Sequence, residues 1–405
     1  MSLLLSIDLI GDDEMENFIF ENSTKAYFGK GCVSQYLPNL LSQYGKTVMV
    51  AYGGGSIKRT GIYDEIMEIL TKAGKDVVEF TGIMANPTYA KVLEGAKLAK
   101  EHDVDLILAV GGGSVMDCCK AVSLAAVYDG DVWNDFWAKA GTIEVQPLPL
   151  GIIMTVSGTG SEMNGGAVIT NEDVKVKTGR DYMELNARFA LLDPLYTYTV
   201  PKLQMVSGAF DSFTHMMETY FSAPDADNVS DSINEALMKS VVRNLRKAIE
   251  NPEDYEARSN LVWLSTMAEN RILKLGKKGD FQGHILEHSL GAFTNCNHGC
   301  GLAVLLPVYY RHIKVAGAEK FARFASEVWG ISPEGKTTAE LANDGVEALA
   351  SFVKEIGLPT TLRELGMTDD QREWLPQIAA GCVVSPGSYK HLEGDEILAI
   401  FEEAW

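Results

Sequence analysis

The chain has few cysteines and no long apolar run. Six cysteines in 405 residues, at positions 32, 118, 119, 296, 300 and 382, are too sparse for a disulfide framework. We therefore expect reduced thiols and a cytoplasmic location. No stretch of about 18 apolar residues predicts a transmembrane helix. Residues 1–14 lack a basic segment and a small-residue cleavage site, so we interpret them as an extension outside the fold rather than a signal peptide.

Positive charge is also scarce. The chain has 35 Lys and Arg against 55 Asp and Glu, a formal net charge of −20. This balance argues against nucleic acid and anionic membrane surfaces as partners, but it identifies no substrate. The content of 46% apolar and 22% charged residues is ordinary for a globular protein. At roughly 100–200 residues per domain, the length predicts two domains.

The hydrophobic pattern changes near Asp193-Pro194. Before that point, short apolar runs end in glycine- and serine-rich turns and are followed by helical patterns. The expected strands are 47–52, 76–80, 105–110 and 150–155, with helices at 63–73 and 88–102. This alternation predicts an α/β domain with a parallel sheet over residues 15–195. From Pro201 onward, apolar residues at three- and four-residue spacing predict an all-helical domain over residues 196–405.

Three glycine-rich turns follow expected strands, although the fingerprint G-x-G-x-x-G is absent. They are Gly53-Gly54-Gly55-Ser56, Gly111-Gly112-Gly113-Ser114, and the segment from Thr155 through Ser157 to Glu162. A glycine turn at the carboxyl end of a parallel strand lets the backbone approach a pyrophosphate, and the next helix N-terminus offers free N–H groups. The second turn fits best, because a strongly apolar strand precedes it and a helix carrying Asp117 and Lys120 follows. The alternatives are a tight turn without a ligand and, for the third segment, a plain loop.

The first turn bears on which dinucleotide binds. An enzyme that prefers NAD usually offers a carboxylate to the ribose 2′-hydroxyl, and that charge repels a 2′-phosphate. Here the strand ends at Gly53, and the backbone N–H groups up to Ser56 can donate to a phosphate. Lys58 and Arg59 either add positive charge or are simply solvated. The pattern favours NADP(H).

Donors suited to a divalent metal gather in the second half. Asp211 and His215 stand four residues apart in a helical stretch, as do His284 and His288, and His298 follows shortly afterwards. A lone histidine on an apolar face is usually a core residue, but this group favours Fe(II), Zn(II), Ni(II) or Co(II) over Mg(II) or Ca(II). Five donors exceed a four-ligand site, which leaves one histidine for chemistry.

Several neighbouring residues have simpler interpretations. Cys296 and Cys300 have no second pair at zinc-finger spacing. Glu218 is expected to be solvated or salt-bridged, with support of a ligand as the alternative, and Lys177 by itself indicates a surface charge. Phenylalanines around the expected cleft suggest a small apolar substrate, although such residues are more often core: Phe213, Phe281 and Phe293.

In order and spacing, these motifs resemble the iron-containing (group III) alcohol dehydrogenases from about Glu16 to the C-terminus. Within that family the chain looks most like the NADP-dependent butanol dehydrogenase or aldehyde reductase branch. The segments that suggest this branch are Gly53–Ser56, Asp193–Thr199 and Pro252–Tyr255. The segments that match the family as a whole are Gly111–Ser114, Thr155–Glu162, Leu192–Pro194, Asp211–His215, Gly283–His288 and His298-Gly299.

The resemblance implies a two-domain plan like that of dehydroquinate synthase, with a metal and a nicotinamide meeting in the cleft. It implies Fe(II), or alternatively Zn(II) or Ni(II), on Asp211, His215, His284 and His298. His288 is then the unligated histidine beside the nicotinamide, and Asp117 joins it as a catalytic candidate. The implied cofactor residues are Gly112, Gly113, Ser114, Asp117, Thr155, Ser157 and Lys177. The segment 21–29 resembles an edge strand through which family members form dimers.

The expected activity is hydride transfer between NADP(H) and small primary alcohols or aldehydes, such as butanol and butyraldehyde. A polyol dehydrogenase of the glycerol or propanediol type is the nearest alternative. A lyase of the dehydroquinate synthase type needs basic residues to hold its substrate, and the Phe-rich helices argue against it. A non-catalytic binding protein has no reason to combine an open metal site with a dinucleotide loop.

Overall fold

Six parallel strands form the sheet of the first half, in the order β3-β2-β4-β5-β8-β1. The computed structural model describes residues 15–223, 228–385 and 389–405, so the predicted extension at 1–14 lies outside it. The strands are β1 (Lys25–Phe28), β2 (Thr47–Ala51), β3 (Asp76–Phe80), β4 (Leu106–Gly111), β5 (Leu150–Met154) and β8 (Phe189–Leu192). Every pairing is parallel, which confirms the predicted parallel sheet.

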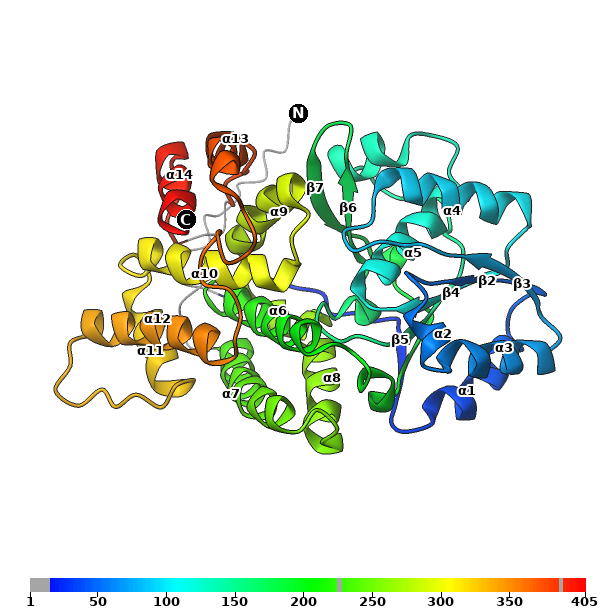
Figure 1. Ribbon diagram of the computed structural model, residues 1–405, viewed down its shortest axis with the longest axis horizontal. Coiled ribbons are helices and arrows are strands. Elements are labelled where there is room, and N and C mark those ends of the chain that lie inside the picture. The colour runs from blue at the N-terminus through cyan, green and yellow to red at the C-terminus, as the bar shows by residue number, and fades with distance from the viewer. Residues whose placement is uncertain (1–14, 224–227, 386–388) are drawn as a thin grey trace, which may run out of the picture.

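Helices cover both faces of this sheet (Figure 1). They are α1 (Cys32–Leu41), α2 (Ser56–Arg59), α3 (Ile62–Lys72), α4 (Tyr89–Glu101) and α5 (Gly113–Ala125). Val48 and Leu108 pack towards α1 and α3, whereas Met49 and Ala109 pack towards α4 and α5. Because successive side chains of a strand point to opposite faces, the central strands are apolar throughout.

The strand order creates a switch point between β2 and β4. After β2 the chain moves outward to β3, and β4 then pairs on the other side of β2. The turn at Gly53 therefore leads to helices on one face, and the turn at Gly111 leads to α5 on the other. Ligands of open α/β sheets bind in the crevice that such diverging connections leave. Two of the three predicted glycine turns flank this crevice.

An antiparallel hairpin of β6 (Gly166–Asn171) and β7 (Val176–Asp181) was not expected from the sequence. Alternate residues of β6, including Ala167 and Ile169, are buried, while β7 is mostly polar. The sequence Gly-Ala-Val-Ile-Thr-Asn of β6 does not alternate in polarity, so this burial pattern was not visible in the sequence. The hairpin stands between α5 and the helical half of the molecule (Figure 1).

The second half is helical, as predicted. Its α-helices are α6 (Lys202–Tyr220), α7 (Val229–Glu250), α8 (Tyr255–Glu269), α9 (Gln282–Thr294), α10 (His298–Ile313), α11 (Ala318–Glu327), α12 (Thr338–Glu355), α13 (Leu375–Ala380) and α14 (Gly394–Glu403). Short 3₁₀ or π helices occur in both halves: η1 (Trp133–Ala138), η2 (Ser161–Met163), η3 (Met183–Leu185), η4 (Pro194–Thr197), η5 (Ile272–Lys274) and η6 (Asp369–Trp374). Helix α6 packs against α7, α8 and α10, and from Met205 onward all but one of its residues are buried. Such a helix can present polar side chains only inside the protein.

The state of the cysteines agrees with the expectation of reduced thiols. All six cysteines are free, and Cys118 and Cys119 are buried in α5 where it packs on the sheet. None of the helices in the described part of the chain is long and apolar enough to cross a membrane.

Gly151 on β5 provides a test of the sheet packing. A Cβ at this position would overlap the buried Phe189 ring. Gly151→Ala should therefore destabilise the protein by roughly 1–3 kcal/mol, as overpacking does in well-filled cores. The measurement is the midpoint of thermal unfolding, with Gly394→Ala as control, because a Cβ there meets nothing within 4 Å. Equal midpoints for the two variants would contradict this account.

Candidate metal and dinucleotide site

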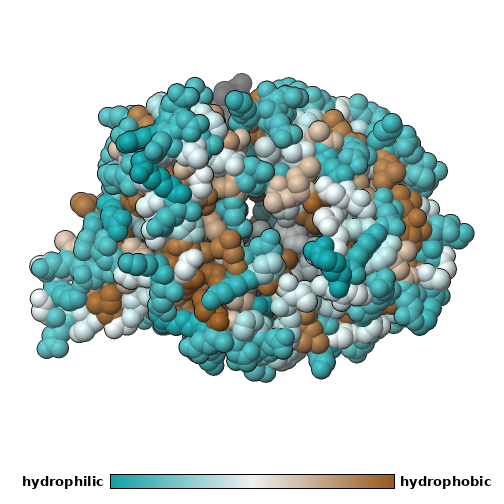
Figure 2. Space-filling model, viewed as in Figure 1, coloured by the Kyte–Doolittle hydropathy of each residue, from teal (hydrophilic) through white to brown (hydrophobic). Residues whose placement is uncertain are grey.

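A cavity of about 680 Å³ lies between the two halves of the chain. Its wall includes the start of α5, the β6–β7 hairpin, and residues of α6, α9 and α10. In the space-filling view a hollow opens between the two halves (Figure 2). The cavity therefore joins the sheet's ligand-binding crevice to the histidines of the helical half.

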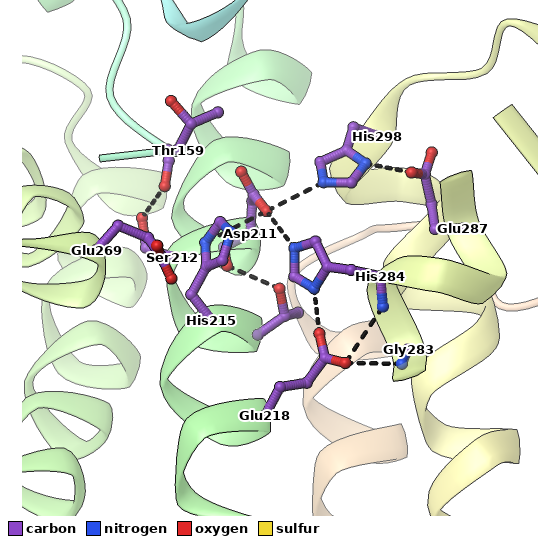
Figure 3. A network of polar contacts seen from close by, with 12 residues as sticks. Thr159, Asp211, Ser212, His215, Glu218, Glu269, Gly283, His284, Glu287 and His298 are labelled. Atoms are coloured by element: carbon purple, nitrogen blue, oxygen red, sulfur yellow. Dashed lines mark hydrogen bonds and ion pairs between the residues drawn. The ribbon is translucent and has the colours of Figure 1, made fainter. Parts of the chain in front are cut away.

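Asp211 is the centre of the predicted metal site (Figure 3). Its Oδ1 lies 3.7 Å from Nδ1 of His215, which is one helical turn further along α6. The same oxygen lies 3.6 Å from Nε2 of His284 on α9 and 3.5 Å from Nε2 of His298, the first residue of α10. Three helices thus bring the four predicted ligands together.

The free donor atoms fit a divalent metal ion. Asp211 Oδ1, His215 Nδ1 and His284 Nε2 are buried and have no hydrogen-bond partner. Orphaned polar atoms of this kind are costly unless something else satisfies them. Ligands at about 2.1 Å around a four-coordinate ion stand about 3.4 Å apart, close to the observed spacing. Donor atoms of Asp211, His284 and His298 all lie within 4.8 Å of one another, a set that does not include His215.

Two buried glutamates hold two of these histidines from behind. Nδ1 of His284 donates to Glu218, and Nδ1 of His298 donates to Glu287. A carboxylate only accepts, so each Nδ1 carries the proton and each Nε2 keeps its lone pair facing Asp211. The expectation of a solvated Glu218 is wrong, because α9 and α10 bury it at 2% exposure. Carboxylates in this position orient metal-binding imidazoles.

The electrostatics of the site favour a cation. Burial opposes ionisation of Asp211, but the surrounding imidazoles hold the pKa of its carboxyl well below the usual range. Burial disfavours the charged form of His284, yet Glu218 and Asp211 raise the pKa of its imidazole to about 10. A proton or a metal ion at His284 is therefore stabilised by the same carboxylates.

His288, the fifth donor, lines the cavity beside these residues. Its ring centroid lies 5.6 Å from that of His298 and 6.1 Å from that of His284. Burial and then the charge of Lys177 hold the pKa of His288 well below its ordinary value, so its imidazole is neutral. It is free to contact a molecule in the cavity.

Lys177 is not a surface charge, contrary to the interpretation of the residue by itself. It lies on β7, its side chain is 3% exposed, and its Nζ lies 3.0 Å from Oε2 of Glu287. Lys177 also lines the cavity. The neighbouring helix α9 covers it, and nothing in the local sequence revealed that contact.

The glycine turns divide into two groups. Gly113 and Ser114 line the cavity at the N-terminus of α5, while Gly111 and Gly112 lie directly behind them. The turn Gly53–Ser56 lies outside the cavity wall, at the end of β2. The turns at Gly53 and Gly111 nevertheless lie at the same edge of the sheet, because β2 and β4 are parallel neighbours.

The third turn mainly joins the two halves. Thr155 and Ser157 do not line the cavity, whereas Thr159 and Ser161 do. The carbonyl oxygen of Gly158 accepts from Ser212 of α6, and its N–H donates to Ser265 of α8. The loop is therefore held against the helical half, and its central hydroxyls face the cavity.

Asp117 and Lys120 tie α5 to the hairpin. The carboxylate of Asp117 accepts from Ser161 Oγ at 2.7 Å and from the N–H of Val168 at 2.9 Å. Lys120 is completely buried and donates to Ser161 and to the carbonyl oxygen of Gly166. Both oxygens of Asp117 are thus engaged within the protein, which suits a positioning role better than proton transfer.

The three phenylalanines expected around the cleft also differ in whether they line the cavity. Phe281 and Phe293 line the cavity, but Phe213 does not, because it is buried in the helical core. Beside Phe281 lies an ion pair that the sequence analysis missed. Lys274 Nζ is 2.7 Å from Glu269, and it stands 4.7 Å from the centroid of the Phe281 ring.

Comparison with known proteins places this geometry in a family. Residues 23–194 match the iron-containing alcohol dehydrogenase family, and residues 205–405 match the C-terminal part of the Fe-containing alcohol dehydrogenase family. The chain is 37% identical to a probable NADH-dependent butanol dehydrogenase 1 of Bacillus subtilis, covering 96% of this chain and 99% of that protein. It is 34% identical to the NADPH-dependent aldehyde reductase YqhD of Escherichia coli, over 87% and 90% of the two chains.

Comparison with a solved structure supports the same family. The crystal structure of NADH-dependent butanol dehydrogenase A from Thermotoga maritima superimposes with a TM-score of 0.90 at 36% identity, covering 96% of this chain and 99% of that one. The family matches span nearly all the described residues, and these relatives exceed 30% identity over most of their length. The chain therefore belongs to the iron-containing alcohol dehydrogenase family and is an alcohol dehydrogenase or aldehyde reductase that uses a nicotinamide cofactor.

Proposed function

We propose that the protein interconverts small primary alcohols and aldehydes of the butanol and butyraldehyde type, with a divalent metal held by Asp211, His215, His284 and His298. The observation that carries the proposal is the set of unpartnered, buried donor atoms around Asp211 Oδ1 at one end of the cavity. Fe(II) is proposed first, and Zn(II) or Ni(II) suit the same imidazole and carboxylate donors.

A divalent metal held by these four residues would supply Lewis acidity for a carbonyl oxygen, and a bound reduced nicotinamide would supply the hydride. The chain's own residues orient the metal ligands and contact the dinucleotide. Glu218 and Glu287 fix the imidazoles of His284 and His298 with Nε2 towards Asp211. Gly113 and Ser114 line the cavity and are proposed to contact the dinucleotide.

His288 is proposed to move the proton. Its neutral imidazole carries one N–H donor and one acceptor nitrogen, and it lines the cavity close to His298. When hydride reaches the carbonyl carbon, the oxygen needs a proton to become a hydroxyl. His288 can pass that proton from solvent through its two ring nitrogens.

The cavity wall also bears on the substrate. Phe281, Phe293 and Ile285 supply apolar surface, which supports a short aliphatic chain. The pair of Lys274 and Glu269 in the same wall favours a second candidate, a dehydrogenase of diols or other polyols, because its charged groups can hydrogen-bond a second hydroxyl. A 1,3-propanediol dehydrogenase of Citrobacter freundii is 29% identical to this chain.

The dinucleotide is proposed to be NADP(H), on the support of the turn Gly53–Ser56, which has no carboxylate of its own. Family membership leaves the choice open, because relatives with either preference are similar to this chain. Of the two cations that follow this turn, Lys58 and Arg59, Nζ of Lys58 lies 3.2 Å from Oε2 of Glu79 on β3. We also propose a cytoplasmic homodimer formed through β1, where Phe28 is 41% exposed at the sheet edge.

Removal of His284 tests the metal site. His284→Ala should lose bound metal and nearly all turnover, because it deletes one of the four proposed ligands. Metal content by inductively coupled plasma mass spectrometry is the measurement, and circular dichroism checks the fold. His102→Ala, at an exposed position at the end of α4, is the control and should keep its metal. Stoichiometric metal in His284→Ala would refute the ligand assignment.

Removal of His288 tests the proton transfer. His288→Ala should retain the metal and lose turnover by roughly 10²–10⁴-fold, the usual contribution of a general acid or base. The measurements are metal content and kcat for butyraldehyde reduction. Loss of the metal in this variant would make His288 a ligand instead.

A carboxylate placed in the first turn tests the choice of dinucleotide. At Gly53 a Cβ would approach the carbonyl oxygen of Ile83 to 3.0 Å, whereas at Gly54 it meets nothing within 4 Å. Gly54→Asp should therefore act by charge and lower kcat/KM for NADPH more than for NADH. The wild type should favour NADPH at least tenfold, about 1.4 kcal/mol, and Gly54→Ala should keep that preference. Equal use of both cofactors by the wild type would overturn the proposal.

A further inference from the structure

Glu287 contacts both His298 of the proposed metal site and Lys177 of the cavity wall. It lies on α9, one residue before His288, and its side chain is 0% exposed. Its Oε2 accepts from Nδ1 of His298 and lies 3.0 Å from Nζ of Lys177. We propose that Glu287 is a positioning residue that couples dinucleotide binding to metal affinity, so that each ligand tightens the other. This inference rests on the proposed function.

The packing around the carboxylate leaves it little freedom. A Cβ at Gly291 would stand 3.1 Å from both Glu287 Oε1 and Lys177 Nζ. A Cβ at Gly301 would stand 2.9 Å from Glu287 Cγ. Glycines on α9 and α10 therefore make room for the ion pair. A change at Lys177 is expected to affect Glu287, because the two side chains are in direct contact.

Charge explains why both partners are needed. A buried carboxylate is costly unless it is paired and hydrogen-bonded. Glu287 is completely buried, and its carboxylate accepts the hydrogen bond of His298 and pairs with the ammonium of Lys177. Donor atoms of Glu287, His288 and His298 also lie within 4.8 Å of one another. The ammonium of Lys177 opposes a second metal ion there, so this group serves the first site.

The direction of the coupling follows from these contacts. Lys177 lines the cavity on the side of the hairpin, facing the space that leads to Gly113. A dinucleotide oxygen that accepts a hydrogen bond from Lys177 draws positive charge away from Glu287. The carboxylate then interacts more strongly with the Nδ1 proton of His298, which makes Nε2 a better metal donor. By linkage, metal binding must tighten the dinucleotide by the same factor.

Glu218 supplies a matched control. It accepts from Nδ1 of His284, as Glu287 does from His298, and it also accepts from the backbone N–H of Gly283 at 2.7 Å. It is equally buried, but it makes no ion pair with a lysine of the cavity wall. Its loss should weaken the metal site without breaking the coupling.

The experiment measures the Zn²⁺ dissociation constant of the full chain by chelator competition. Each protein is titrated without dinucleotide and with saturating NADPH or NADH, whichever it binds more tightly. The wild type should bind Zn²⁺ at least fivefold more tightly with dinucleotide, the lower end of typical coupling. Glu287→Gln should bind Zn²⁺ roughly 10–100-fold more weakly, with a dinucleotide effect below about twofold. Glu218→Gln should show similar weakening but keep the wild-type dinucleotide effect.

Lys177→Met is the second variant, for the case that Glu287→Gln fails to fold. It leaves the contact between Glu287 and His298 in place. It should bind Zn²⁺ and lose the dinucleotide effect. A wild type that binds both ligands with no mutual effect would overturn the coupling and leave the proposed function standing. A wild type that binds no Zn²⁺ would overturn the proposed metal site itself. Coupling that persists in Glu287→Gln and in Lys177→Met would assign it to another route.

Discussion

Three imidazoles face one oxygen of a buried carboxylate, and the packing of the surrounding helices has to hold these unpartnered polar atoms together. Asp211 Oδ1 lies 3.5 to 3.7 Å from a nitrogen of each of His215, His284 and His298. Unpartnered polar atoms inside a protein are unfavourable, so the surrounding packing must hold them until a cation satisfies them. Helices α6, α9 and α10 do so from within the core of the helical half. The carboxylates of Glu218 and Glu287 complete the arrangement by fixing two of the rings.

The hairpin β6–β7 connects this centre to the sheet. Its Lys177 pairs with Glu287 on α9, and its Asp181 pairs with Arg271, which adopts a positive φ of 75°. On the other side, Asp117 and Lys120 of α5 hold the hairpin and the third turn. Polar contacts therefore run from α5 through the hairpin to the proposed metal ligands. The proposed coupling between the two sites would use this continuous set of contacts.

Family membership and pocket chemistry address different questions. The match over both halves gives the class of reaction, because relatives with the same plan are alcohol dehydrogenases and aldehyde reductases. The substrate depends on side chains at the cavity wall, where the apolar Phe281 and Phe293 stand beside the charged pair of Lys274 and Glu269. Function lives in such sites rather than in the fold.

The sequence by itself determined the parallel sheet, the helical second half and the donor groups, because these follow from local periodicity and spacing. Asp211 and His215 share a helix face at four-residue spacing wherever that helix lies. It did not determine which residues are buried against distant partners. Lys177 lies in a short segment of alternating Val and Lys, and Glu218 follows a run of mixed residues, so both suggested solvent exposure. Only the packing of α9 and α10 decided that they are buried, because burial depends on contacts between residues separated by roughly 65 to 110 positions.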